Sequence, residues 1–468
     1  MREDLKSGEL SLSMFAADLY DVALCQGNKI YSDPKEFFSF TYPTFNIREL
    51  SKDVAIRLAG KSDKAVRQLE LTYGGGKTHT LITLYHLFNK PEKLPMIQSV
   101  KEFIEHIGFT PPKARIVILS FDKIDVEKGV ETISPAGEKR WLRNPWSILA
   151  FQIAGSEGIK LLNSQEKDEE RETAPAENLL TTLLQVPEKE GLSTLILIDE
   201  VLMYAREKVA QDPLWRIKLT NFFQYLTQSA TKVRKCAIVA SLLATDPRKN
   251  DDLGKQIIQE LYAVFRRERD ESVQPVVKED VAEVLRRRFF TPDSIMDREA
   301  FRPHVLAAMK GISEFDDQIH KEGKIAEDRY LRSYPFHPDL TEVFYTKWTN
   351  LEGFQRTRGV LRTYALALRE AEKWDLSPLI GPTIFLASPG KSSISMAARE
   401  LTVIAETEES HGKKQDWTSI LESELEKAIK IQSGLGGLKN REIEQSVFTV
   451  FLHSQPIGQK VSTKELLI

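Results

Sequence analysis

Three glycines directly precede a lysine and a threonine, in the run Gly74, Gly75, Gly76, Lys77 and Thr78. Backbone N–H groups of glycines can converge on an anion because no Cβ atoms obstruct them, and a helix that follows adds the positive end of its dipole. In such a loop the lysine bridges the β- and γ-phosphates and the threonine hydroxyl holds Mg²⁺. The run therefore predicts binding of ATP with Mg²⁺, and we count His79, the next residue, among the binding residues.

The residues on either side of this loop carry the patterns of a strand and a helix. Apolar residues alternate from residue 66 to the loop, which predicts a strand over 66–72, and the pattern over 78–89 is helical. Leu71 stands where the general phosphate-loop consensus begins with a glycine, so this loop has a shorter form. A glycine turn that precedes Lys-Thr by chance is the alternative, and the strand and helix favour the phosphate loop.

Asp199 and Glu200 form a second reactive group at the end of an unbroken apolar run over 192–198. A continuous apolar run suits a central parallel strand that is buried on both faces. Asp199 is expected in the Mg²⁺ shell and Glu200 is expected to polarise the attacking water, because successive strand residues point in different directions. A solvated strand end is the alternative. With Lys77 and Thr78, the two carboxylates predict hydrolysis of ATP to ADP and phosphate.

A third apolar run, over 235–244, predicts another buried strand beside the same site. ATPases with an additional strand keep a polar side chain there that senses the γ-phosphate. Ser241 is the candidate, and Thr245 and Asp246 are alternatives. A hydroxyl that bonds to the neighbouring backbone is an equally good interpretation of any of them.

Arginines near the end of a predicted helix over 252–269 suggest a homo-oligomer. In ring-forming ATPases an arginine at this place, just before the last strand (here 273–277), reaches into the neighbouring subunit's site. Arg266 and Arg267 are the candidates, with Arg269 beside them. The alternative is that these cations favour the helix C-terminus, and the sequence does not choose among them.

A further arginine lies in a predicted helix over 358–373, in the pattern Gly359-x-x-Arg362. This pattern resembles the second sensor motif of AAA+ lids, in which the arginine contacts the γ-phosphate. Arg362 is therefore a candidate catalytic residue and Arg358 is the second choice. The alternative is an ordinary surface arginine on an amphipathic helix, because four-residue motifs recur by accident.

The composition is that of an ordinary globular chain of two to four domains, with 468 residues, 41% hydrophobic residues and a net charge of −3. Cys25 and Cys236 lie far apart, which favours a reduced, cytoplasmic protein. No apolar run approaches the length of a membrane span, and the acidic N-terminus resembles no signal sequence. The histidines show no metal-binding spacing, so we expect His79 and His86 to be packing or surface residues rather than metal ligands. The chain ends within a helical pattern, and we expect either a longer natural protein cut at that point or a short version of one.

Alternating strands and helices predict an α/β fold, namely a P-loop NTPase of the additional-strand, AAA+-like type, with a parallel sheet covered by helices on both faces. The segment 123–145 is expected to form a surface excursion with a hairpin. The predicted domains are an N-terminal helical lead-in (1–60), the P-loop ATPase core (61–278), a helical lid (279–380) and a mostly helical C-terminal region, winged-helix-like in its latter part (381–468).

Several motifs together resemble one family, and they are Thr41-Tyr42-Pro43-Thr44, Arg57-Leu58-Ala59-Gly60, the run from Gly74 to Leu81, Leu84-Tyr85-His86 and the run from Phe354 to Arg362. This family consists of large bacterial and archaeal P-loop ATPases catalogued as a domain of unknown function, and the ATPase of BREX-type defence systems is similar. The resemblance covers most of 35–370. It implies an AAA+-like core with a lid, Mg-ATP as ligand, and partnership with DNA and with DNA-modification or phage-defence proteins.

Three functions are compatible with these residues. The first is an Mg²⁺-dependent ATPase that acts as a motor or switch on DNA. The second is a scaffold that is gated by ATP and turns over little. The third is a small-molecule kinase, which Glu200 disfavours because a carboxylate at that place suits activation of water.

Overall fold

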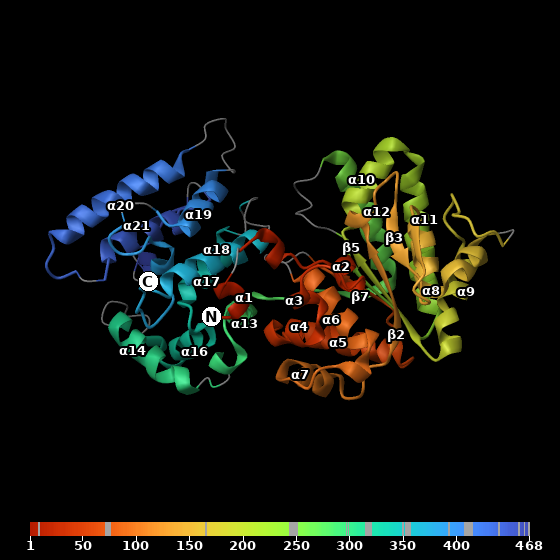
Figure 1. The fold of residues 1–468 in the computed structure, drawn as a ribbon, viewed down its shortest axis with the longest axis horizontal. Helices are drawn as coiled ribbons and strands as arrows, with labels where there is room; N and C mark the ends of the chain where they lie inside the picture. The colour runs from red at the N-terminus through yellow and green to blue at the C-terminus, as the bar shows by residue number, and fades with distance from the viewer. Residues whose placement is uncertain are drawn as a thin grey trace. The chain divides into compact units, whose positions relative to one another are not determined.

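The computed structural model describes the chain outside residues 8–9, 71–75, 164–165, 243–250, 296, 298, 314–320, 349–350, 352–356, 392–393, 407–414, 439, 457–458, 463 and 467–468. Two compact units make up the chain. The sheet unit comprises Ala17–Ser39 and Pro43–Val276, and the helical unit comprises Met1–Ala16, Phe40–Tyr42 and Val277–Ile468. Both units (Figure 1) therefore combine separate stretches of the chain.

The sheet unit is built on five parallel strands in the order β2-β5-β6-β1-β7. Their bounds are β1 (Val66–Leu69), β2 (Ala114–Ser120), β5 (Ser193–Asp199), β6 (Cys236–Ser241) and β7 (Arg269–Val273). Every residue of β5 and β6 is buried, as the continuous apolar runs indicate for central strands. The predicted parallel sheet of an α/β fold is confirmed.

Helices cover both faces of this sheet (Figure 1). On one face, Val117, Ile196 and Ile238 share a hydrophobic core with residues of α8 to α12. On the other face, α5 and α6 contact the strands. The helices in this part of the chain are α2 (Leu19–Ala23), α3 (Lys29–Ser32), α4 (Pro34–Phe40), α5 (Phe45–Leu58), α6 (Lys77–Asn89), α7 (Gln98–Ile107), α8 (Pro145–Leu162), α9 (Glu177–Leu184), α10 (Val201–Gln211), α11 (Leu214–Lys232) and α12 (Asp252–Glu268).

The predicted excursion over 123–145 contains the hairpin of β3 (Val130–Ile133) and β4 (Lys139–Leu142), which pair antiparallel. The last predicted strand was wrong by four residues, since β7 ends at Val273 rather than beginning there. Pro275 has no N–H to donate to a ladder. The carbonyl oxygens of Gln274 and Pro275 instead accept hydrogen bonds from Asn46 Nδ2 (2.7 Å) and Thr44 Oγ1 (2.6 Å).

The helical unit has a core of its own, to which its separate chain segments contribute. Leu5 from the N-terminal segment, Phe289, Phe385 and Phe448 all belong to this core. Its principal helices are α1 (Glu3–Lys6), α13 (Val281–Phe289), α14 (Arg302–Ser313), α16 (Lys324–Ser333), α17 (Pro338–Thr346), α18 (Thr357–Ala371), α19 (Met396–Glu406), α20 (Trp417–Ser433) and α21 (Glu442–His453).

The structure groups the predicted segments differently from the sequence. Residues 279–380 and 381–468 share one core, and residues 1–60 are divided between the two units. Within the described part of 381–466 the structure has helices and turns but no strand, so the hairpin wing of a winged helix is not found there. Among the described residues, no helix is long and apolar enough to cross a membrane.

Candidate functional site

The carboxyl ends of three neighbouring strands carry the residues that the sequence singles out. Lys77 and Thr78 begin α6 after β1, Asp199 ends β5 with Glu200 next to it, and Ser241 ends β6. We call these five residues the strand-end cluster. In parallel sheets, ligands bind outside the carboxyl ends of the strands, because loops and helix N-termini gather there.

A hydrogen bond joins two halves of this cluster. Thr78 Oγ1 donates to Asp199 Oδ2 at 2.9 Å, although the two residues are 121 positions apart in the chain. Asp199 in turn lies opposite Ser241 in the β5–β6 register. The structure therefore brings together Thr78, Asp199 and Ser241, which the sequence assigned separately to one site.

The start of α6 depends on Gly76. This residue is the N-cap and has φ +83° and ψ −15°, a left-handed conformation that glycine adopts without a steric penalty. A Cβ atom at this position would lie 3.2 Å from Val276 Cγ2, so the space is also close-packed. The Gly76 carbonyl accepts hydrogen bonds from the Thr80 N–H (2.7 Å) and Oγ1 (2.5 Å). Gly74 and Gly75, the other predicted loop residues, lie outside the described residues.

Asp199 is a buried carboxyl group, with a residue exposure of 4%. Burial and then the Glu200 carboxylate raise the pKa of Asp199 to about 7, against the opposing effects of Thr78 and Lys77. The Ser241 hydroxyl also lowers this pKa, although its geometry is not that of a hydrogen bond.

Two buried oxygens of the cluster, Asp199 Oδ1 and Ser241 Oγ, have no hydrogen-bond partner among the described residues. Buried polar atoms are seldom left without a partner, since each one costs about 1–3 kcal/mol. Carboxylate and hydroxyl oxygens are the donors that Mg²⁺ prefers. The oxygen atoms of Asp199, Thr78 and Ser241 thus suit a hard cation or a ligand that donates hydrogen bonds.

Lys77 is half-buried at the first position of α6. Burial lowers the pKa of its ammonium group, whereas the carboxylates of Asp199 and Glu200 raise it. Because both carboxylates act on Lys77, the three charges lie within electrostatic reach of one another. A cation and two carboxylates at a helix N-terminus are compatible with recognition of an anion together with a metal ion.

Glu200 has an unusual backbone for a residue with a side chain. It is the N-cap of α10 with φ +55° and ψ +46°, and its N–H donates to the Ser241 carbonyl at 3.0 Å. The left-handed conformation costs a non-glycine residue about 1–2 kcal/mol. Such strain persists where the surrounding structure requires it, often at functional sites. It directs the chain sharply from β5 into α10 and leaves the Glu200 side chain half-buried.

His79 and His86 both pack against aromatic residues. The His79 ring lies 4.5 Å from the Phe37 ring, between centroids. His86 is buried and its Nε2 lies 2.8 Å from the Tyr31 carbonyl oxygen. Both histidines therefore pack against aromatic rings, and the predicted contribution of His79 to ligand binding stays a prediction.

The arginine candidates lie on α12 of the sheet unit and on α18 of the helical unit. Arg266 and Arg267 are exposed at the end of α12, and the Arg266 guanidinium lies 6.0 Å from the centre of the Tyr262 ring. Arg362 pairs with Glu400 and donates through Nε to the Leu10 carbonyl at 2.5 Å, all within the helical unit. These bonds tie α18 to α19 and to the N-terminal segment.

Thr245 and Asp246 lie outside the described residues, and so do the side chains of Arg358 and Arg269.

Arg57 is a residue whose role the sequence did not reveal. Its side chain is fully buried in the sheet unit and donates hydrogen bonds to five backbone carbonyls. These belong to Ser62 (2.6 Å), Ala230 (2.7 Å), Thr231 (3.1 Å), Val233 (2.8 Å) and Cys236 (2.9 Å). The guanidinium thereby satisfies the carbonyls at the end of α11 and at the start of β6, the strand that carries Ser241. The Arg57-Leu58-Ala59-Gly60 motif was the only signal for this residue.

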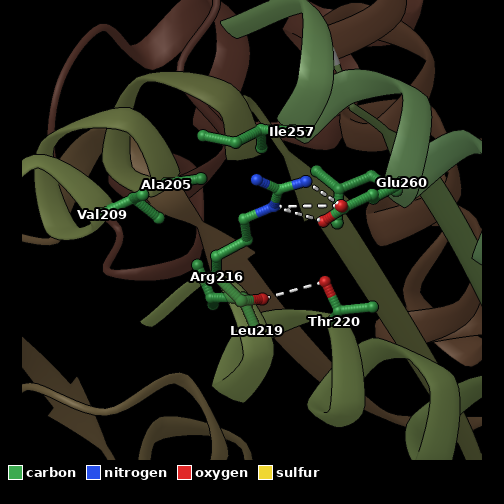
Figure 2. Close-up of a pocket in the computed structure, with 8 residues that line it drawn as sticks. Ala205, Val209, Arg216, Leu219, Thr220, Ile257 and Glu260 are labelled. Atoms are coloured by element: carbon green, nitrogen blue, oxygen red, sulfur yellow. Dashed lines mark hydrogen bonds and ion pairs between the residues drawn. The ribbon is translucent and has the colours of Figure 1, made fainter. Parts of the chain in front are cut away.

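A small cavity lies between α10, α11 and α12 (Figure 2). Its volume is about 10 Å³, roughly room for one water molecule. Arg216 Nε lies 2.9 Å from both carboxylate oxygens of Glu260 beside it. Because this cavity is so small and its two charged side chains pair with each other, we regard it as part of the helix packing rather than as a ligand site.

The fold and the strand-end cluster define an α/β protein with a five-stranded parallel sheet and polar residues gathered at the strand ends. Residues 1–273 match the model of the DUF499 N-terminal domain, and residues 276–465 match that of the DUF499 second domain. The chain therefore belongs to the DUF499 family. The two matches meet close to Val276, where the sheet unit ends. No curated protein and no solved structure matches the chain.

Proposed function

We propose that this chain is an Mg²⁺-dependent ATPase whose active site is the strand-end cluster. The observation that carries the proposal is the hydrogen bond from Thr78 Oγ1 to Asp199 Oδ2, which links the residue after Lys77 to the carboxylate at the end of β5. The strand order supports it, because β6 lies between β1 and β5 as in P-loop ATPases with an additional strand. The glycines before Lys77 and the N-terminus of α6 suit the phosphates of ATP.

In this proposal each residue of the cluster has a separate task. Lys77 binds the β- and γ-phosphate oxygens, and Thr78 and Asp199 hold Mg²⁺, which neutralises charge on the phosphates when bound. Glu200 accepts a hydrogen bond from the attacking water and takes up its proton as the water oxygen bonds to the γ-phosphorus, while the bond from the γ-phosphorus to the bridging oxygen breaks and ADP leaves with that oxygen. Ser241 Oγ is free to donate to a phosphate oxygen, since it has no partner among the described residues.

The test is steady-state ATP hydrolysis by the full chain and two variants. We expect Lys77→Ala and Glu200→Gln each to lower turnover by about 100-fold or more, the range for loss of a catalytic acid-base group or a preorganised charge. Glu207→Gln, at an exposed position on α10, is the matched control and should leave turnover unchanged. Undiminished hydrolysis in Glu200→Gln would rule out its role, and failure of the unaltered chain to bind ATP would overturn the proposal.

We also propose that the ATPase acts in a DNA-linked defence complex, and this role rests on the motifs from Gly74 to Leu81 and from Phe354 to Arg362. Double-stranded DNA added to the same assay distinguishes a motor on DNA from a nucleotide-gated scaffold. A motor on DNA should hydrolyse ATP faster when DNA is present. ATP binding without turnover, with or without DNA, would instead favour a nucleotide-gated scaffold.

A further inference from the structure

The sheet unit contains a second cavity, far larger than the first, at the open edge of β2. Its volume is about 300 Å³, at the lower end of the range of ligand pockets. The walls come from α2, the end of α6, α8, the β3 strand and β2 itself, through residues that include Tyr20, Tyr85, Gln152 and Thr132. None of the residues of the strand-end cluster lines it.

Within the part of the chain that the structure describes, β2 is an edge strand, because it pairs with β5 on one side only. The Lys113 carbonyl accepts from the Ser193 N–H of β5, and backbone groups alternate in direction along a strand. Arg115 and Val117 therefore point their backbone groups to β5, whereas Ala114 and Ile116 point theirs away from it. Among the described residues, the backbone groups of Ala114 and Ile116 have no partner on that outer side. Both residues line the cavity.

The next outward-facing residue, Ile118, shows which chemistry this edge accepts. Its N–H donates to Gln152 Oε1 and its carbonyl accepts from Gln152 Nε2, both at 2.8 Å. A side-chain amide has the same donor and acceptor as a peptide group. Gln152 thus bonds both backbone groups of Ile118 as a neighbouring strand would. The open part of the edge therefore stops before Ile118.

The charges around the cavity indicate the side chains of an occupant. Three cations and one carboxylate line it, namely Lys90, Lys113, Arg115 and Glu131. Lys113 pairs with Glu92 at 3.4 Å, Arg115 with Glu190 at 2.5 Å, and Glu131 with Lys139 at 2.9 Å. Lys90 is exposed and has no ion pair with a described residue.

We propose that this cavity binds an extended peptide segment of a partner protein, which adds as a strand to the edge of β2 and places a carboxylate beside Lys90. Addition of a strand derives its affinity from main-chain hydrogen bonds and its specificity from side-chain pockets. Ala114 and Ile116 lie about 7 Å apart, so a stretch of about three peptide residues pairs with both. The proposal is independent of ATP hydrolysis.

The test uses two fluorescein-labelled peptides of alternating valine and threonine, one flanked on both sides by glutamates and the other by lysines. Fluorescence anisotropy with the full chain should show at least tenfold tighter binding of the glutamate peptide. Lys90→Glu should abolish or reverse this preference. Failure of both peptides to bind, or an unchanged preference in Lys90→Glu, would overturn the proposal.

Ile116→Pro tests the main-chain bond itself. Proline removes the outward N–H of Ile116 but no hydrogen bond of the sheet, and prolines are found on edge strands for this reason. It should weaken binding of the glutamate peptide about tenfold or more, whereas the matched variant Ile116→Ala retains the N–H and should stay within about threefold of the unaltered chain. Equal binding of the glutamate peptide by the two variants would show that the Ile116 N–H takes no part in binding and would overturn strand addition.

Hydrogen exchange supplies a measurement that needs no variant. In the free chain the amides of Ala114 and Ile116 should exchange faster than those of Arg115 and Val117, which bond to β5. Saturation with the glutamate peptide should slow exchange at Ala114 and Ile116 at least tenfold. Exchange that does not change on saturation would place the peptide elsewhere and contradict the proposal.

Discussion

At the scale of single residues, Asp199 couples the candidate site to pH. Its pKa of about 7 lies above the ordinary value, so the folded chain binds more protons than the unfolded chain between about pH 4 and pH 7. Stability therefore falls as the pH rises through this window, and the loss is complete above pH 7. The buried, ionised carboxylate at the end of β5 therefore lowers the free energy of unfolding.

Asp199→Asn removes that charge while it keeps an oxygen that can accept from Thr78. We expect a higher free energy of unfolding at pH 8, on the order of 4 kcal/mol, and a smaller gain at pH 5.5. Urea denaturation at the two pH values measures both. Glu207→Gln should show no such pH-dependent gain, and an Asp199→Asn gain that does not shrink at pH 5.5 would show that the carboxyl group is not buried in ionised form.

Glu200 allows backbone strain to be separated from chemistry. Glycine adopts φ +55° without penalty, so Glu200→Gly should leave stability unchanged or raise it by about 1 kcal/mol, while it abolishes the proposed turnover. The control is Glu207→Gly within α10, which should cost about 1 kcal/mol because glycine is unfavourable inside helices. Equal destabilisation by the two variants in urea would contradict the strain at Glu200.

At the scale of secondary structure, Arg57 holds the end of α11 and the start of β6. Arg57→Ala should lower the free energy of unfolding by at least about 3 kcal/mol, since several buried carbonyls lose their donor. Arg57→Lys should recover only part of the loss, because an ammonium cannot replace the planar fork of a guanidinium. Arg206→Ala, which breaks the more exposed pair with Asp251, should cost less than about 1 kcal/mol. If Arg57→Ala lowers the free energy of unfolding in urea only slightly, Arg57 does not hold the end of α11 and the start of β6 together.

The strands could be predicted where local pattern decides them. β5 and β6 are continuous apolar runs, and β1 begins at residue 66, where the alternating pattern begins. β7 was misplaced because Thr44 and Asn46, more than 220 positions away, bond the residues that were expected to pair. The strand order and the open edge of β2 could not be predicted, since they depend on which strands meet rather than on the pattern of any one.

For the candidate site, the sequence predicts which residues take part but not how they come together. Lys77, Thr78, Asp199 and Glu200 are marked by residue type and by their place at the ends of elements. Their approach is a property of the fold, seen in the Thr78–Asp199 bond. Arg57 carries no chemical signature at all, because its function is to satisfy carbonyls of residues distant in the chain.

At the scale of the whole molecule, the first residues of the chain belong to the core formed by its second half. Leu5 is fully buried there, and Arg369 Nε donates to its carbonyl at 3.0 Å. Leu5→Ala should destabilise the helical unit by about 2–5 kcal/mol. Peptides from α17 to α21 should then exchange hydrogen faster, while those from β5 and β6 do not change.

The matched control for Leu5→Ala is Leu197→Ala, which empties a buried position in the sheet unit. It should have the opposite pattern, with faster exchange in β5 and β6 and no change in α17 to α21. Faster exchange in both units with either variant would show that the two units unfold together as one cooperative structure.

The bond between Thr44 and Pro275 also bears on the order in which the chain can fold during synthesis. Pro43 and Val276 are where the chain enters and leaves most of the sheet unit, and this bond holds those two points together across 231 residues. Closing a loop of that length costs about 5 kcal/mol in chain entropy. If the sheet unit folds first, this loss of chain entropy has already occurred when residues 277 onward leave the ribosome. The N-terminal segment Met1–Ala16 can then pack against those residues without closing the long loop again. Until then Leu5, Leu10 and Phe15 lack the core in which they are buried, so a polypeptide halted before that point exposes apolar side chains that favour aggregation.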